Sequence, residues 1–393
     1  MPETGPAIGG PAPGGGAAAA SGTGVAVASG GGTAAAPASA PRRLRHPEAR
    51  EIAILMLSAL GDAVHVLPVA NALRRAYPGA RITWIVQPVP HRLVAGHPAV
   101  DEFVLFRRRR GLDAWRSYAE LRRALAARGR RFDLLLALQV YFKAGLIAAL
   151  TPARTKLGFD RARARDANWL FTNERIPPRP VGHVQDQYFE FLEHLGIDPA
   201  PVEWGLAPTA AERETQLGFF AGLDRPAAAL VVGTSKPEKN WPPERWARLA
   251  AALDQDFGLR LVIVGGPSAA ERAVAEAIVR ASGVPVVNAL GDDVRRLLWL
   301  LDGARLVVSP DTGPLHIARA VDTPVVGLYG YTNPRRYGPY RKFTELVVDG
   351  YARAPGEDYP CSMSHRPGGM ERVSVEMVLE KIERALALPP RTR

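Results

Sequence analysis

Hydrophobic residues form short, regularly spaced runs along the chain, and helical apolar patterns lie between these runs. An apolar run of four to eight residues suits a strand that is buried on both faces. Alternation of such strands with helices predicts a parallel sheet covered by helices on both sides. In the first part of the chain we expect strands over 52–57, 81–86, 102–106 and 133–138, and helices over 63–76 and 114–127.

A second alternating series begins near residue 228, after a less regular stretch that contains one expected helix over 187–195. Here we expect strands over 228–232, 259–264, 284–287, 306–309 and 324–328, and helices over 243–257, 269–281, 294–301, 315–321 and 373–386. Two such series predict an α/β protein with two Rossmann-like, doubly wound domains that face a central cleft. Ligands of these sheets bind beyond the carboxyl ends of the strands.

The expected organisation has four parts. Residues 1–45 are rich in Gly, Ala, Pro, Ser and Thr without an apolar face, and we expect them to form a disordered tail. Residues 46–215 are expected to form the first Rossmann-like domain. Residues 216–370 are expected to form the second, and 371–393 a closing helix and tail.

Composition limits the possible functions only partly. The 393 residues suffice for two domains, and a single cysteine, Cys361, excludes an internal disulfide and a Cys-cluster metal site. The net charge of +11 attracts anions, whether nucleic acid, anionic membrane or a phosphorylated substrate. No apolar run approaches the ~20 residues that span a bilayer, and the N-terminus lacks the basic region of a secretory signal. We therefore expect a cytoplasmic protein that touches the membrane from inside.

The first candidate motif joins the strand over 52–57 to the following helix. Asp62 is expected at the helix N-terminus and at the mouth of the cleft, where a helix dipole favours its ionised form and a general base has access to substrate. Gly61 would allow a tight turn and leave room for substrate. His65 lies one helical turn further on. The alternatives are that Asp62 is only an N-cap and that His65 is structural.

The second candidate motif is a polar loop over 233–242, between a strand and a helix. It contains Thr234, Ser235 and Lys239, and free amides, hydroxyls and lysines suit an anion. The alternative is a solvated loop closed by the aromatic ring of Trp241.

The third candidate motif runs from the end of one strand into the next helix. Asp311, Thr312, Gly313, Leu315 and His316 belong to it. Backbone amides at the start of a helix bind phosphate without a side-chain cation. A plain capping turn would have the same composition, and His316 would then simply pack.

Two further features leave alternatives open. The run 107–110 consists of four arginines, which form either a solvated loop or an anion-binding rim for a phosphorylated or membrane-bound acceptor. Gly265 and Gly266 form a generic strand-to-helix turn. The G-x-G-x-x-G fingerprint, the P-loop, the nucleophile elbow and the H-E-x-x-H helix are absent from the sequence.

In order and spacing, these motifs together resemble glycosyltransferase family 9, the heptosyltransferases of lipopolysaccharide core synthesis. The likeness extends over about residues 51–340. The segments that carry it are LSALGDAVHVLP at 57–68, HPAVD at 97–101, KNWP at 239–242 with Trp246, DTGPLHIA at 311–318 and LYG at 328–330. The segment 351–370, with Cys361 and His365, matches nothing in this pattern.

The resemblance implies a GT-B fold and an inverting transfer that needs neither a metal nor a cofactor. Asp62 matches the base that acts on the acceptor hydroxyl, and Lys239 matches a cation that contacts the donor phosphates. It further implies ADP-heptose as donor, lipid A–Kdo or a growing core as acceptor, transient contact with the inner membrane and no nucleic acid. The donor-binding residues it implies are Thr234, Ser235, Asp311, Thr312, Gly313, Leu315 and His316, with Gly61 and His65 near the acceptor.

Other functions fit the same architecture. A family-9-like transferase could use another nucleotide sugar, and a nucleotide-sugar epimerase of GT-B fold would need no acceptor. The missing glycine fingerprint argues against a dinucleotide-dependent oxidoreductase. A non-catalytic protein that binds sugar nucleotides or nucleic acid is suggested only by the basic charge.

Overall fold

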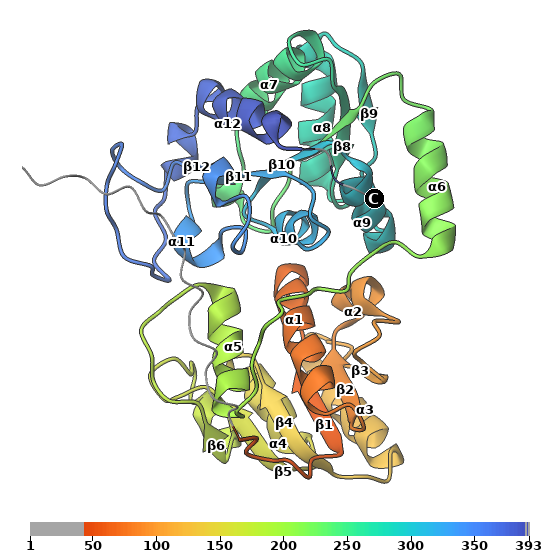
Figure 1. Cartoon of the computed structure of the whole chain (residues 1–393), viewed down its shortest axis with the longest axis vertical. Helices are drawn as coiled ribbons and strands as arrows, with labels where there is room; N and C mark the ends of the chain where they lie inside the picture. Colours follow the sequence, from red (N-terminus) through yellow and green to blue (C-terminus); the bar gives the residue numbers. More distant parts are fainter. Residues whose placement is uncertain (1–42, 390, 392–393) are drawn as a thin grey trace, which may run out of the picture. The chain divides into compact units, whose positions relative to one another are not determined.

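The computed structural model describes residues 43–389 and 391, and within them the chain forms two six-stranded parallel sheets with helices on both faces (Figure 1). The strand orders are β3-β2-β1-β4-β5-β6 and β12-β11-β10-β7-β8-β9. The two orders are the same when one is counted from its other end, and both are typical of Rossmann folds. The expected α/β class with two doubly wound units is therefore confirmed. Residues 1–42 of the expected tail lie outside the described residues.

The first sheet is built around a buried central strand, in which Ile52 lies between Ile82 and Leu134 of its two neighbours. Its strands are β1 (Glu51–Leu55), β2 (Arg81–Val86), β3 (Glu102–Leu105), β4 (Phe132–Ala137), β5 (Ala153–Gly158) and β6 (Glu174–Arg175). Its helices are α1 (Leu60–Ala76), α2 (Pro88–Val94), α3 (Ala114–Ala127), α4 (Phe142–Leu150) and α5 (Val184–His194), with 3-10 turns η1 (Gly111–Asp113) and η2 (Asn168–Phe171). The sequence analysis missed α2, α4, β5 and β6.

The second sheet has the same plan. Its strands are β7 (Ala227–Val231), β8 (Arg260–Val264), β9 (Val286–Asn288), β10 (Leu306–Pro310), β11 (Val325–Tyr329) and β12 (Val347–Asp349). Its helices are α6 (Ala210–Ala221), α7 (Pro243–Gln255), α8 (Ala269–Ser282), α9 (Val294–Gly303), α10 (Gly313–Ala320), α11 (Pro334–Tyr337) and α12 (Val375–Ala387), with 3-10 turns η3 (Pro237–Lys239), η4 (Thr344–Leu346) and η5 (Gly369–Arg372). The sequence analysis missed α6, α11 and β12.

The expected domain boundary near residue 215 falls inside α6. This helix packs on α9 of the second half, where the Gln216 amide donates to the Trp299 carbonyl at 2.6 Å. A capping box of Thr209 and Glu212 begins the helix. Residue 215 therefore lies in a helix that packs on the second half.

The strand order places the site. In each sheet the order reverses next to a central strand, between β1 and β4 in the first and between β7 and β10 in the second. The loops that leave these strands border the crevice in which doubly wound proteins bind ligands. All three candidate motifs lie on such loops. None of the helices among residues 43–389 and 391 has the length and hydrophobicity that crossing a membrane requires.

Candidate active site

Loops from both sheets line one cavity of about 590 Å³. The first half contributes the β1–α1 connection, and the second half contributes the loops after β7 and β10. Figure 1 shows the start of α1 close to α10, between the two sheets. The predicted site residues that line this cavity are Gly61, Asp62, His65, Ser235, Lys239, Asp311, Thr312, Gly313 and His316.

Asp62 is the third residue of α1 and is only partly buried. Its carboxylate accepts hydrogen bonds from the Ala59 amide at 2.9 Å and from the Tyr188 hydroxyl at 3.2 Å. Burial raises the pKa of the Asp62 carboxyl, and the nearby Asp311 carboxylate adds to this, whereas the two hydrogen bonds oppose it. A carboxylate with a raised pKa on a cavity wall suits a general base.

This geometry changes the sequence-based view of the motif. The N-cap of α1 is Ala59. Asp62 is the third residue of the helix, and its side chain caps the N-terminus by accepting a hydrogen bond from the Ala59 amide. The expected effect of the helix N-terminus on Asp62 is outweighed, because burial raises the pKa of the carboxyl. Gly61 lies inside the first turn of α1 and not in a tight turn before it.

Two glycines let the halves approach each other closely. A Cβ atom on Gly61 would lie 2.8 Å from Cδ2 of His316, and a Cβ atom on Gly313 would lie 3.1 Å from the Cβ atom of Leu60. The starts of α1 and α10 therefore meet with almost no side chain between them. Both helix N-termini, with their partial positive charge, border the same cavity.

Lys239, which is partly buried, and Asp311, which is buried, form an ion pair where the second half lines the cavity. The Lys239 ammonium donates to Oδ2 of Asp311 at 2.6 Å and to its backbone carbonyl at 3.1 Å. The Thr332 hydroxyl donates to the same carboxylate at 2.6 Å, and Nε2 of His316 lies 3.7 Å from it. Burial alone would raise the pKa of Asp311, but His316 and Lys239 outweigh it and hold this pKa well below its usual range. An ammonium has three protons, so one remains for a ligand in the cavity.

Helix α10 presents its backbone to the same space. Its N-cap is Thr312, whose side chain makes no capping hydrogen bond. Pro314 has no amide proton and the Leu315 amide donates to the Thr312 carbonyl at 3.1 Å, so among the first three residues of this helix the Gly313 amide is the one left open to an anion. This is the arrangement expected for a phosphate-binding helix start.

Two predicted donor residues do not line the cavity. The Thr234 hydroxyl lies within hydrogen-bond distance of the Lys236 carbonyl and of the Asn240 side chain, so it shapes the loop after β7. Leu315 is fully buried and packs against β11, where its Cδ1 is close to Gly327. Ser235, which follows Thr234 in the same loop, does line the cavity.

His65 is a buried, neutral histidine with a defined tautomer. The Gln185 side chain donates from Nε2 to the His65 carbonyl at 2.9 Å, which turns Oε1 of the same amide toward Nδ1 of His65, also at 2.9 Å. Nδ1 therefore carries the proton. Burial and the neighbouring His316 and His183 rings hold the pKa of His65 well below its usual range.

Several lining residues were not found from the sequence. Tyr188 comes from α5, and Gln139 follows β4 and hydrogen-bonds the β1–α1 connection. Met363 and His365 belong to the unassigned segment 351–370, and the His365 ring stacks on Tyr331 at 4.7 Å. Only the position of Gln139, directly after a strand at the switch point, could have been recognised in advance.

A second cavity of about 770 Å³ opens on the first half and shares Ala59, Asp62, Gln139 and Tyr141 with the first. Its wall is basic, because Lys143 and three arginines of the 107–110 run face it. Three arginines of the run therefore line a space that Asp62, the candidate base, also borders.

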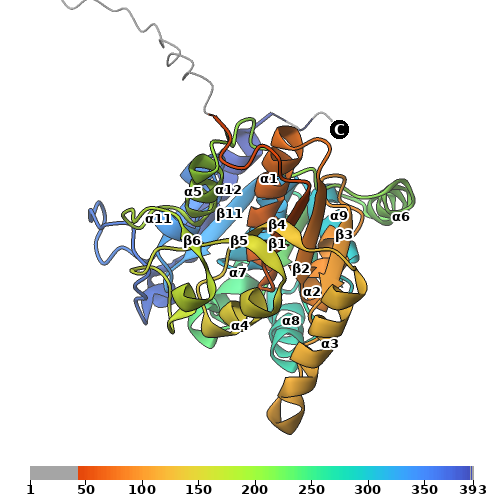
Figure 2. The same ribbon diagram turned by 90° about the horizontal axis from the view of Figure 1, so that it is seen from below.

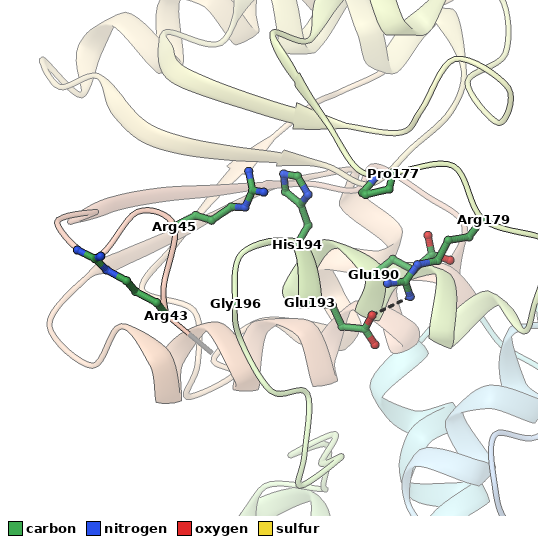
Figure 3. A pocket seen from close by; sticks show the side chains of 8 residues that line it. All are labelled: Arg43, Arg45, Pro177, Arg179, Glu190, Glu193, His194 and Gly196. Carbon is green, nitrogen blue, oxygen red and sulfur yellow. Dashed lines mark hydrogen bonds and ion pairs between the residues drawn. The ribbon is translucent and has the colours of Figure 1, made fainter. Parts of the chain in front are cut away.

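A third, more open hollow shares no residue with these two cavities (Figure 3). Several of its charges are paired, since Arg179 binds Glu193 at 2.7 Å and His194 binds Glu174 at 2.7 Å. Elsewhere in the described ranges, 43–389 and 391, no three or more His, Cys, Asp or Glu side chains gather as a metal site. The chemistry-bearing side chains therefore concentrate at the first two cavities.

Comparison with known proteins adds an independent line of evidence. Residues 118–366 match the family model described as glycosyltransferase family 9 (heptosyltransferase). The chain is similar to the lipopolysaccharide core heptosyltransferase OpsX of Haemophilus influenzae, with 31% identity over 299 residues that cover 76% of this chain and 84% of the relative.

Solved structures show the same fold. A family 9 glycosyltransferase of Veillonella parvula superposes with a TM-score of 0.73 and 22% identity, covering 87% of this chain and 99% of that one. The Escherichia coli heptosyltransferase WaaC, solved with ADP, superposes with a TM-score of 0.67 and 23% identity, covering 85% of this chain and 99% of that one.

Proposed function

The chain belongs to glycosyltransferase family 9, the heptosyltransferase family, and from this premise we propose that it moves heptose from ADP-heptose onto a lipopolysaccharide core or lipid A–Kdo acceptor. The transfer inverts the anomeric centre and uses no metal. One observation carries the proposal. Asp62 from one half and the Lys239–Asp311 pair from the other line a single cavity.

The donor side stabilises the leaving diphosphate. Negative charge grows on the ADP phosphates as the glycosidic bond breaks, and preorganised donors aimed at that charge supply a large catalytic contribution. Here these are the remaining proton of Lys239 and the Gly313 amide at the start of α10. Asp311 holds the ammonium in place. ADP in a heptosyltransferase of the same fold supports this choice of nucleotide.

The acceptor side supplies the nucleophile. Asp62 takes the proton of the attacking hydroxyl, a contribution typically of ~10²–10⁴ in rate. The acceptor reaches Asp62 through the basic second cavity, where arginines and Lys143 bind its anionic groups. The acceptor is a membrane glycolipid, so the reaction takes place at the cytoplasmic face of the inner membrane. In this proposal the positive charge of the protein attracts it to this membrane surface and not to nucleic acid.

A direct assay tests the proposal. The protein is incubated with ADP-heptose and a lipid A–Kdo acceptor, and the product is followed by mass spectrometry, with NMR reporting the anomeric configuration. Asp62→Asn should lose ~10²–10⁴ of the rate while calorimetry shows unchanged ADP binding. The amide oxygen can still accept from the Ala59 amide, so the helix start is preserved.

Other outcomes have distinct meanings. Turnover of UDP-, GDP- or dTDP-sugars in place of ADP-heptose would show that the proposed donor is wrong and that the protein is still a glycosyltransferase. Isomerised sugar formed without acceptor would indicate an epimerase. Loss of activity in EDTA, restored by a divalent cation, would overturn metal independence, and near-normal activity of Asp62→Asn would remove Asp62 as the base.

A further inference from the structure

Large apolar side chains are exposed around one cavity mouth. Leu112 in η1 is 95% exposed and Trp115 at the start of α3 is 63% exposed. Tyr141 and Phe142 at the start of α4, which line the neighbouring basic cavity, are 52% and 43% exposed. Isolated exposed hydrophobics are common on protein surfaces, but a group of them beside one opening marks an interaction site.

Cations surround these side chains. All four arginines of 107–110 are exposed, and among the described residues Arg107, Arg108 and Arg110 take part in no ion pair. Arg122 lies two helical turns after Trp115 on the solvent face of α3 and is likewise exposed. Its neighbour Arg123 is exposed too. This surface therefore exposes both large apolar side chains and positive charges.

The elements that carry this surface also line the basic cavity. Arg108 to Gly111, Ala114 and residues 141–144 all line this cavity. The cavity continues inward to Ser58 and Asp62. Figure 2 shows α3 projecting from the first half, where other elements leave its outer side uncovered. The opening that leads to the candidate base is thus framed by exposed Leu, Trp and Arg side chains.

We propose that this surface, formed by residues 107–116 and 141–143 and named here the basic rim, docks on an anionic phospholipid bilayer. Charge complementarity selects this partner, since arginines bind the phosphate headgroups while Leu112 and Trp115 enter the interface. Roughly 1 kcal/mol per cation is available from such lipids. The rim holds the cavity mouth against the membrane, so that a membrane-held acceptor extends its headgroup toward Asp62. This last step rests on the proposed function, whereas the docking itself does not.

Vesicle co-sedimentation of the full chain tests the docking. Binding is expected to vesicles of phosphatidylethanolamine and phosphatidylglycerol but not of phosphatidylcholine alone, and 0.5 M salt should weaken it. Arg108→Gln with Arg110→Gln should lower the partition coefficient about 30-fold, from ~1 kcal/mol for each of two cations. Leu112→Ser with Trp115→Ser should lower it at least as much.

Matched controls come from the second half. Leu217 in α6 is 59% exposed, so Leu217→Ser removes a comparable apolar side chain, and Arg248→Gln removes an exposed arginine of α7. Both variants should sediment like the unmodified chain. Equal losses in rim and control variants, or equal binding to phosphatidylcholine, would overturn the proposal. So would a dimer in gel filtration that the Leu112→Ser, Trp115→Ser variant dissociates, because the rim would then be a subunit interface.

Activity separates the docking from the catalytic proposal. Leu112 and Trp115 do not line the cavity, so their double variant should keep its rate on a water-soluble, delipidated acceptor and lose at least tenfold on the same acceptor anchored in vesicles. Equal rates of the unmodified chain and this variant on the anchored acceptor would show that the rim does not position the acceptor. If no acceptor were glycosylated at all, the proposed function would be wrong. Vesicle co-sedimentation would still test independently whether the rim docks on the membrane.

Discussion

The hydroxyl of Tyr188 donates a hydrogen bond of 3.2 Å to the Asp62 carboxylate, across 126 positions of sequence. Opposing effects act on the pKa of this carboxyl. Burial raises the pKa, whereas this hydrogen bond and that of the Ala59 amide lower it. The tyrosine itself stays protonated, since burial first, and the Asp62 charge second, raise the pKa of its phenol well above the usual range. Tyr188 therefore acts as a fixed hydrogen-bond donor that favours the ionised form of Asp62.

Tyr188→Phe should move the pH profile of the enzyme. Removal of a hydrogen bond to the charged form raises the pKa of Asp62, so the acid limb of kcat/KM should shift to higher pH. The plateau at alkaline pH, where Asp62 is ionised in both forms, should change much less. Rates measured between about pH 5 and 9 check this. A profile that drops uniformly without shifting would show that Tyr188 only shapes the cavity.

Lys239→Met should weaken binding of ADP and slow transfer. The variant loses one donor to the phosphates and also leaves the Asp311 carboxylate buried without its main cation. A loss of stability must therefore be separated from a loss of binding. The double variant Lys239→Met with Asp311→Asn removes both charges, and Thr332 can still donate to the amide oxygen.

Thermal melting and calorimetry distinguish the two effects. The single variant should be destabilised by about 3–5 kcal/mol, the usual cost of breaking a buried pair from one side. The double variant should recover much of the melting temperature but none of the ADP affinity. Recovered affinity in the double variant would mean that Lys239 matters only as the partner of Asp311.

Much of this architecture followed from the sequence, because buried parallel strands are continuous apolar runs that stand out from their surroundings. Helix α3 was predicted with its observed limits, and the candidate motifs lie at strand ends as expected. Helix α4 was missed because FKAGLIAAL is apolar nearly all round and lacks a helical periodicity. Helix α6 was missed although Thr209 and Glu212 form a recognisable capping box.

The side-chain pairings of the site could not have been predicted in the same way. Lys239 and Asp311 are 72 positions apart, and no local pattern indicates that they meet. The sequence also suggested a conformational reason for Gly61, whereas its neighbour across the cavity, His316, is what leaves no room for a side chain. Such relations depend on how the two halves pack together.

His183 should make folding sensitive to mild acid. Burial lowers its pKa to about 4. Nε2 donates to the Gly338 carbonyl at 2.9 Å and Nδ1 accepts from the Gln185 amide at 3.1 Å, which leaves no free site for a second proton. The unfolded chain takes up that proton near pH 6.5. Stability contributed by His183 is therefore complete above about pH 6.5 and falls as the pH drops toward 4.

The size of this effect is on the order of 3 kcal/mol at most, from the difference between the two pKa values. Denaturant unfolding of the unmodified chain and of His183→Gln, at several values of pH between 7 and 4, measures it. The variant should be less stable at pH 7 and lose less on acidification. Parallel curves for the two proteins would contradict the assignment, since the acid sensitivity would then come from other groups, such as the buried His65.

Gly61→Ala should impair catalysis more than folding. The added methyl group would lie 2.8 Å from the His316 ring, so either the ring moves away from Asp311 or the starts of α1 and α10 separate. Both changes disturb the cavity that Asp62 and Lys239 share, and a displacement of about 1 Å can cost ~10² in rate.

Gly218→Ala in α6 is the matched control, because a methyl group there meets nothing within 4 Å. In a helix interior this exchange should stabilise the protein by about 0.5–1 kcal/mol and leave the rate unchanged. Full activity in Gly61→Ala would show that the close approach of the two helices is not needed for transfer.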